Sequence, residues 1–213
     1  MVALLLDIRT AIAILIVPNI VMDAAQIFRG GFPAAILRRF SWLLVLTVFG
    51  VFIGTKVLVM LPIWALNLSL GVMVLVFVVS NFFRFEPEIP PRLERVSSPI
   101  IGLAVGFLNG MTNAAGPVLA SYLYGLKLPK TEFVRSISTI FMITKISQLA
   151  AVSTWNLFTF ETLRLSAGVT VFVMLGFYFG LKTQDRVNQK TFNRGLLVIL
   201  FVIGVMLVVR GLR

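Results

Sequence analysis

Six apolar runs, each long enough to cross a bilayer as a helix, alternate with short polar segments along the chain. A transmembrane helix needs about 20 mostly apolar residues. We therefore predict an all-α integral membrane fold, with six spanning helices at residues 8–28, 40–60, 64–83, 134–154, 163–181 and 193–209.

A further apolar run, residues 99–125, has a different pattern. Its segment 106–117 reads GFLNGMTNAAGP, with three glycines, two asparagines, a threonine and a proline. We expect a helix to break here. Broken backbone at membrane depth is tolerated only where protein buries it or a wet cavity solvates it, and transporters use such breaks to bind substrate. The alternative interpretation is a glycine-lined helix contact.

The sequences on either side of a polar linker, residues 84–98, resemble each other. A shift of 126 positions places Lys56 on Lys182, Asn67 on Asn193, and the pair Gly50 and Gly54 on Gly176 and Gly180. These matches predict an internal repeat of two halves, residues 1–83 and 99–213. The glycine pairs are expected to allow close helix packing.

The glycine-rich element opens only the second half, because its counterpart would precede Met1. Either the chain lost that element or its start was cut.

Basic residues indicate the topology. If residues 99–125 dip into the membrane and return, most Lys and Arg residues lie on the cytoplasmic side; if they cross once, this bias disappears. We therefore predict an inverted repeat with a broken, re-entrant glycine-rich element between the halves, in the inner (plasma) membrane as a multi-pass protein.

Composition agrees with a membrane class and excludes several chemistries. The chain is 59% hydrophobic with a mean hydropathy of +1.01. Its net charge of +11 is interpreted as loop charge that orients the spans, so no nucleic acid is expected. Cysteine and histidine are absent, and Asp23 is the one acid inside an apolar run. We expect no enzymatic activity, no cofactor and no metal site.

Lys145 is the strongest single candidate for function. It lies near the middle of a spanning run, where an ammonium group is costly unless it faces water or a partner. Helical spacing places Ser138 and Gln148 on the same face. Lys145 is interpreted either as an anion ligand or as a structural partner of Asp23.

Other candidates lie at expected irregularities of the helices. Pro18 should kink the first span, and the neighbouring Asn19 is the repeat counterpart of Lys145. Asn19 either faces the same centre as Lys145 or bonds to another helix. A half-helix that starts at Gly116 and Pro117 would direct free N–H groups toward an anion. The expected substrate-binding residues are Asn109, Gly110, Thr112, Asn113, Gly116, Pro117, Lys145 and Asn19.

The segment 106–117, followed by KLPKTEFVR at 127–135, resembles the second half of the TauE/SafE sulfite exporter family. The order of helix, loop and Gly-x-x-x-Gly helix in both halves extends this resemblance over essentially the whole chain. It implies transport of small anions, often sulfur oxyanions or organosulfonates. The family usually opens each half with a glycine-rich element. This chain has the second one only, and it has Asn113 where glycine is common.

Two functional interpretations follow. The first is a secondary membrane transporter of small anions, driven by the membrane potential or by a proton carried on Asp23 or on the substrate. The second is a non-transporting membrane component or a truncated remnant of such a transporter. The expected partners are a small anionic substrate and the lipid bilayer, and a homo-oligomer is left open.

Overall fold

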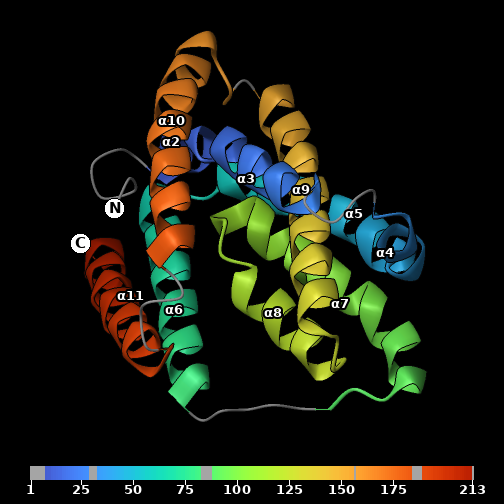
Figure 1. Cartoon of the computed structure of the whole chain (residues 1–213). Coiled ribbons are helices and arrows are strands. Elements are labelled where there is room, and N and C mark those ends of the chain that lie inside the picture. Colours follow the sequence, from blue (N-terminus) through green and yellow to red (C-terminus); the bar gives the residue numbers. More distant parts are fainter. Residues whose placement is uncertain (1–7, 29–32, 83–87, 156, 184–188, 213) are drawn as a thin grey trace.

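The computed structural model describes residues 8–28, 33–82, 88–155, 157–183 and 189–212. All regular elements in these ranges are α-helices, which confirms the predicted all-α class (Figure 1). The helices are α2 (Ile8–Ile14), α3 (Ile16–Phe28), α4 (Ala34–Arg39), α5 (Ser41–Met60), α6 (Ile63–Phe82), α7 (Pro91–Thr112), α8 (Gly116–Gly125), α9 (Lys130–Thr154), α10 (Phe160–Thr183) and α11 (Gln189–Gly211).

Four stretches of the described helices are long and apolar enough to cross a membrane. They are Arg9–Ile27, formed by α2 and α3 together, Ser41–Met60, Lys130–Thr154 and Phe160–Phe179. The apolar parts of α6 and α11, Ile63–Val79 and Leu197–Gly211, are shorter within the described residues. Each of the six predicted spans thus corresponds to a helix or a helix pair, and four of them meet the criterion of length and apolarity.

The first span is interrupted between α2 and α3, as Pro18 predicts. Proline has no N–H group, and its ring clashes with the carbonyl of the residue four positions earlier, which is Ile14. The regular helix is interrupted only at Leu15, and the carbonyl oxygen of Ile14 accepts a hydrogen bond of 2.6 Å from the Ser166 hydroxyl. The kink therefore also connects the first span to α10.

Helices α5 and α7 are in backbone contact along a series of glycines. A Cβ atom on any of these glycines would collide with backbone atoms of the other helix, and the Thr47 hydroxyl donates a 3.0 Å hydrogen bond across the contact to the Gly102 carbonyl. This confirms the packing role predicted for the first glycine pair. The glycines are Gly50 and Gly54 on α5, and Gly102, Gly106 and Gly110 on α7.

The second glycine pair differs from the first. A Cβ atom on Gly176 would meet nothing within 4 Å, and the surroundings of Gly180 lie outside the described part of the chain. Close packing at this pair stays a prediction, as does the superposition of the two halves.

The chain breaks after Thr112 and returns on itself, so that α7 and α8 form a hairpin. Asn113 has a φ of 60°, and α8 begins at Gly116. The Ile89 N–H donates a 2.9 Å hydrogen bond to the Gly125 carbonyl, which places the residues just before α7 beside the end of α8. The predicted break is confirmed, and the element starts and finishes at the same end of the molecule.

Helix α7 starts earlier than the sequence pattern suggested. The linker was expected to extend to residue 98, but residues 91–98 form the first two turns of α7. Pro91 lies in the first turn, where its missing N–H costs nothing. Glu94, also in the first turn, favours the positive end of the helix. The polar composition of this stretch therefore reflects an exposed helix start rather than a connector.

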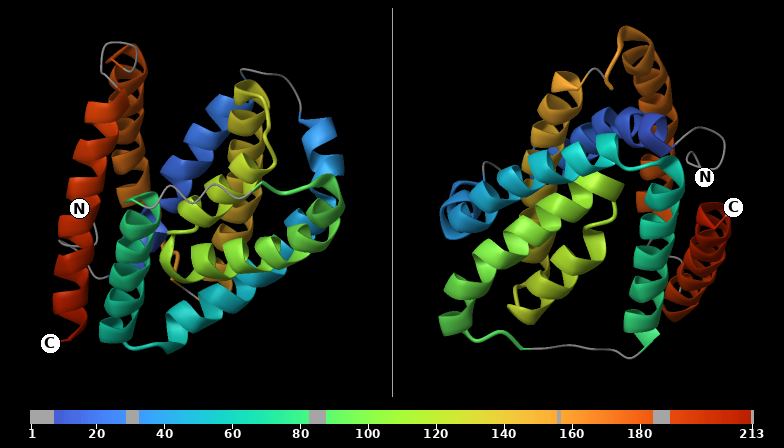
Figure 2. Two further views of the ribbon diagram at one scale, coloured as in Figure 1. Left: turned by 90° about the horizontal axis from the view of Figure 1, so that it is seen from below. Right: turned by 180° about the vertical axis from the view of Figure 1, so that it is seen from behind.

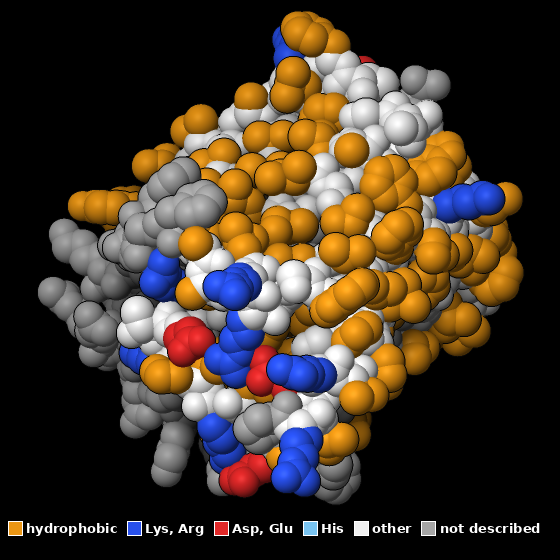
Figure 3. All heavy atoms as spheres, turned by 90° about the vertical axis from the view of Figure 1, so that its right-hand side faces the viewer, with side chains coloured by type: hydrophobic (Ala, Val, Ile, Leu, Met, Phe, Trp, Pro, Cys, Tyr) orange, Lys and Arg blue, Asp and Glu red, His pale blue; other side chains and the backbone are white. Residues whose placement is uncertain are grey.

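Charged side chains join three elements at one end of the molecule. Arg39, at the end of α4, contacts Glu94 at 2.8 Å near the start of α7 and Glu132 at 3.1 Å near the start of α9. Figure 3 shows most of the charged side chains of one face gathered in its lower part, with many hydrophobic side chains above them. The end of α4 and the starts of α7 and α9 therefore lie at one end of the molecule.

Helices α6 and α11 pack against each other at one edge of the molecule (Figure 2). Glycines again allow the approach: a Cβ atom on Gly71 would collide with Val208, and one on Gly211 with the backbone of Trp64 and Leu68. This pair forms one side of a cavity beside the break, described below.

The glycine contact between α5 and α7 can be tested by its contribution to the stability of the protein. We expect Gly106→Ala to destabilise the protein by about 1–3 kcal/mol, because its Cβ has no room against the Thr47 backbone. The matched control is Gly176→Ala, which has open space and should be neutral or stabilising by up to about 1 kcal/mol. Thermal unfolding midpoints in one detergent would compare them, and equal effects would contradict the assigned contact.

Candidate functional site

Lys145 is buried on the face of α9 that meets the helix break. Its side chain is only 4% exposed. The ammonium nitrogen donates hydrogen bonds to three amide oxygens: Asn109 Oδ1 at 3.2 Å, Gln148 Oε1 at 3.0 Å, and Asn113 Oδ1. All three N–H groups of the ammonium are thus satisfied by neutral partners.

Local structure explains why these amides meet the lysine. Gln148 is three residues after Lys145 on α9 and shares its face. Asn113 adopts the left-handed conformation that ends α7, which Asn tolerates better than most residues. Its N–H donates to the Asn109 carbonyl at 3.0 Å, and the Gln148 amide donates to that same carbonyl at 3.0 Å. The end of α7 is therefore held against α9.

The NH₂ groups of the three amides have different environments. Gln148 uses its NH₂ on the Asn109 carbonyl, and Asn113 directs its NH₂ to the Ile12 carbonyl at 3.5 Å. Asn109 is 2% exposed, and its Nδ2 has no hydrogen-bond partner in the described part of the chain. A buried unsatisfied donor costs about 1–3 kcal/mol. It is a group that an acceptor atom of a ligand would satisfy.

Helix α8 adds further donors at the break. It begins at Gly116 with Pro117 in its first turn, as predicted, and Ala115 at its N-cap provides no side-chain hydrogen bond. Among the described residues, no acceptor is found for the N–H groups of Gly116 and Val118. A Cβ on Gly116 would meet only Phe141 of α9, at 3.9 Å, so this positive helix end is open.

The remaining predicted residues lie elsewhere. The Thr112 hydroxyl donates to the Leu108 carbonyl at 2.8 Å and lies 3.7 Å from the Met73 sulfur, so it is used within the fold. Gly110 faces the backbone of α5 and has a packing role. Asn19 is half-buried on α3, and its side chain makes no hydrogen bond to any described residue.

Asp23 is electrostatically coupled to Lys145 but does not form an ion pair with it. Asp23 is half-buried on α3, a helix that packs against α9, and Lys145 is the charged group that acts on it. Neutral amides, not this carboxylate, hold the ammonium. The described residues contain no cluster of acidic side chains that could hold a metal ion.

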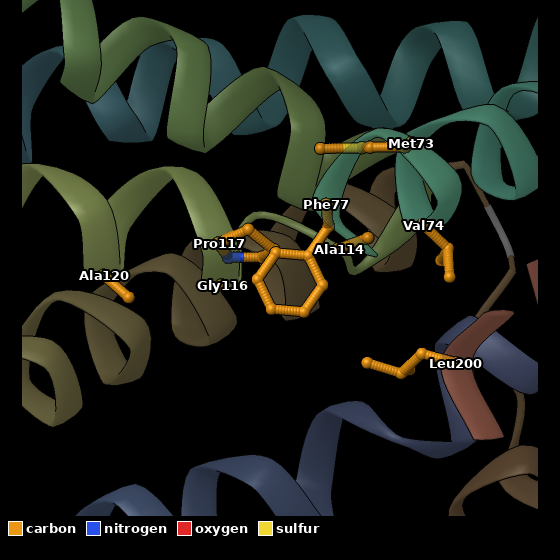
Figure 4. A pocket seen from close by; sticks show the side chains of 8 residues that line it. All are labelled: Met73, Val74, Phe77, Ala114, Gly116, Pro117, Ala120 and Leu200. Atoms are coloured by element: carbon orange, nitrogen blue, oxygen red, sulfur yellow. The ribbon is translucent and has the colours of Figure 1, made fainter. Parts of the chain in front are cut away.

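An apolar cavity of about 330 Å³ lies beside the break, between α8 and the α6–α11 pair (Figure 4). Sequence reasoning missed this feature, because the residues come from three separate helices and the break, and none is unusual for a membrane protein. Its lining consists of Met73, Val74, Phe77, Ala114, Gly116, Pro117, Ala120 and Leu200.

Comparison with known proteins agrees with the expected family. The family profile described as "Sulfite exporter TauE/SafE" matches residues 1–207. No curated protein and no solved structure matches the chain. Members of this family are membrane transporters of sulfite and other sulfur anions rather than enzymes. The match covers nearly the whole chain, and the protein therefore belongs to the TauE/SafE sulfite exporter family.

Proposed function

We propose that this protein is a secondary transporter of small anions, with sulfur oxyanions or organosulfonates as substrates, and that the Lys145 cluster is its anion site. Family membership supports the class of substrate. The observation that carries the proposal is the buried ammonium of Lys145, whose hydrogen-bond partners are all neutral amides. Its positive charge therefore remains uncompensated by any hydrogen-bonded carboxylate, and it favours an entering anion.

Binding requires one amide oxygen to leave the ammonium. Asn113 is the best candidate, because it lies in the break and is only half-buried, whereas Asn109 and Gln148 are almost fully buried within helices. The anion would then accept from Lys145 and from Asn109 Nδ2, which has no other partner among the described residues. Gly116 leaves space for its approach, and Pro117 starts the half-helix whose N–H groups face the break.

The transport cycle that we propose uses the two halves as an inverted repeat in the inner membrane. The hairpin of α7 and α8 would dip into the bilayer and return, which its hydrogen-bonded ends support. The halves would rock around the Lys145 cluster, as in other transporters with broken helices. Asp23 would compete electrostatically with the anion for Lys145, and its protonation would couple a proton to anion movement.

One observation favours the alternative, a membrane component that does not transport. The ammonium of Lys145 already has three acceptors, so the buried charge is accommodated without any ligand. In that case the cluster would hold α7 against α9 and would serve stability alone. The two functions differ in whether an anion changes the behaviour of the protein.

Replacement of Lys145 distinguishes an anion transporter from a membrane component that does not transport. We expect Lys145→Met to fold with reduced stability, because the buried amide oxygens of Asn109 and Gln148 lose their donor at a cost of about 1–3 kcal/mol each. It should lose the anion-dependent stabilisation of the wild-type protein, which is about 2.7 kcal/mol at one hundred times the dissociation constant. Thermal unfolding with sulfite, sulfate, thiosulfate, sulfoacetate and taurine measures this, with the exposed Lys56→Met as the control. An unchanged shift in Lys145→Met would refute the proposed site.

Substitutions of Asn113 test the displacement of its amide oxygen. Asn113→Asp keeps the shape and tolerates the left-handed backbone, but its carboxylate would pair with Lys145 permanently. We expect this variant to lose anion binding while its ligand-free stability stays equal or rises. Asn113→Gly also fits the backbone and leaves one ammonium N–H free, so it should still bind. Tight anion binding by the Asp variant would show that the ligand does not use this position.

The proposed role of Asp23 predicts that its replacement changes the affinity of the protein for sulfite. Asp23→Asn removes a negative charge that acts on Lys145, so we expect sulfite to bind several-fold more tightly. Transport by this variant in proteoliposomes should lose its dependence on an imposed pH gradient. Glu161→Gln, on an exposed residue of α10, is the control and should change neither property. Weaker sulfite binding in Asp23→Asn would exclude competition between the carboxylate and the anion.

A further inference from the structure

The cavity beside the break has walls that do not suit an inorganic anion. The side chains that line it are apolar, and none of the lining residues is charged. Met73 and Phe77 are four residues apart on α6 and project from one face, and Gly116 and Ala120 are four apart on α8. A hydrated oxyanion gains nothing from such walls, and burying it there without hydrogen bonds would be costly.

One side of the cavity is formed by the break that carries the proposed anion site. Gly116 and Pro117 form both the open N-terminus of α8 and part of the cavity wall, and Ala114 directly follows Asn113. A Cβ atom on Gly116 would meet only Phe141, at 3.9 Å, and Phe141 precedes Lys145 by one turn of α9. A ligand at the break can therefore have one end at the polar cluster and the other in the cavity.

We propose that this cavity binds the apolar body of an organic anion whose charged group is held at the Lys145 cluster. The inference rests on the proposed function and specifies its substrate as a sulfonate with an alkyl or aryl group. The volume of about 330 Å³ lies in the range of small-molecule pockets, about 300–1,000 Å³, and exceeds the needs of a single oxyanion. Phe77, Met73 and Pro117 provide large side chains for packing against the ligand, while the small residues Ala120 and Gly116 leave space for it (Figure 4).

A series of sulfonates with one headgroup tests the proposal. The purified protein in phospholipid nanodiscs is titrated with methanesulfonate, butanesulfonate and benzenesulfonate, and dissociation constants are obtained from thermal shifts. Each buried methylene should tighten binding about fourfold, the equivalent of about 0.8 kcal/mol. Butanesulfonate should therefore bind at least about tenfold more tightly than methanesulfonate. Equal binding of all three sulfonates would overturn the cavity assignment and leave the anion site in place.

Substitutions in the cavity wall test whether the apolar group of the sulfonate binds there. Ala120→Leu fills the cavity from α8 and should weaken butanesulfonate and benzenesulfonate about tenfold without changing methanesulfonate binding. Ala150→Leu adds the same side chain at an exposed position of α9 and should change none of them. Phe77→Ala removes part of the wall and provides a second test, with selective loss of benzenesulfonate affinity. Equal effects of the two Leu variants would contradict the proposal.

Neutral ligands distinguish a substrate site from a groove filled by lipid chains. 1-Butanol and benzyl alcohol carry the same apolar groups without the anion and should produce no saturable shift. If they stabilise the protein as much as the sulfonates do, the cavity binds apolar groups independently of Lys145 and the proposal is wrong. If no sulfonate and no inorganic anion binds at all, the proposed function fails, and this inference fails with it.

Discussion

The structure depends on the hydrogen bonds that the protein provides to the buried ammonium group of Lys145. Lys145 lies in a helix that is apolar and long enough to cross a membrane, and it is nearly fully buried. A charge in that position must be neutralised, hydrated or hydrogen-bonded. Here three amide oxygens from two helices and the break between α7 and α8 provide the hydrogen bonds. Amides satisfy the N–H groups without supplying a negative charge.

The surrounding fold keeps those amides in place. Backbone contact through glycines holds α7 against α5, which in turn packs against α9. The end of α7 is joined to α9 by the hydrogen bond from the Gln148 amide to the Asn109 carbonyl. The left-handed Asn113 then turns the chain, and α8 returns to the end from which α7 started. The same turn opens the N-terminus of α8 and separates it from α6, which creates the apolar cavity next to the polar cluster.

Sequence reasoning located the helices, the break and Lys145 because each depends on local pattern. The length of apolar runs gives spans, Pro18 gives the kink after Ile14, and a lysine within such a run is conspicuous by itself. Gly110 is predicted to let a ligand approach, but it packs on the backbone of α5. The sequence does not distinguish a glycine needed for helix packing from one needed for ligand binding. The partners of Lys145 and the cavity wall from α6 depend on the register between distant helices, which no local pattern contains.

The most direct test is the structure of the protein saturated with a heavy oxyanion such as selenate. If the ammonium of Lys145 is the anion site, selenium density will lie within hydrogen-bond reach of Lys145 Nζ and Asn109 Nδ2, and the Asn113 oxygen will have left the ammonium. If all three amide oxygens remain on Lys145 at saturating selenate, the buried charge is structural and the anion site lies elsewhere.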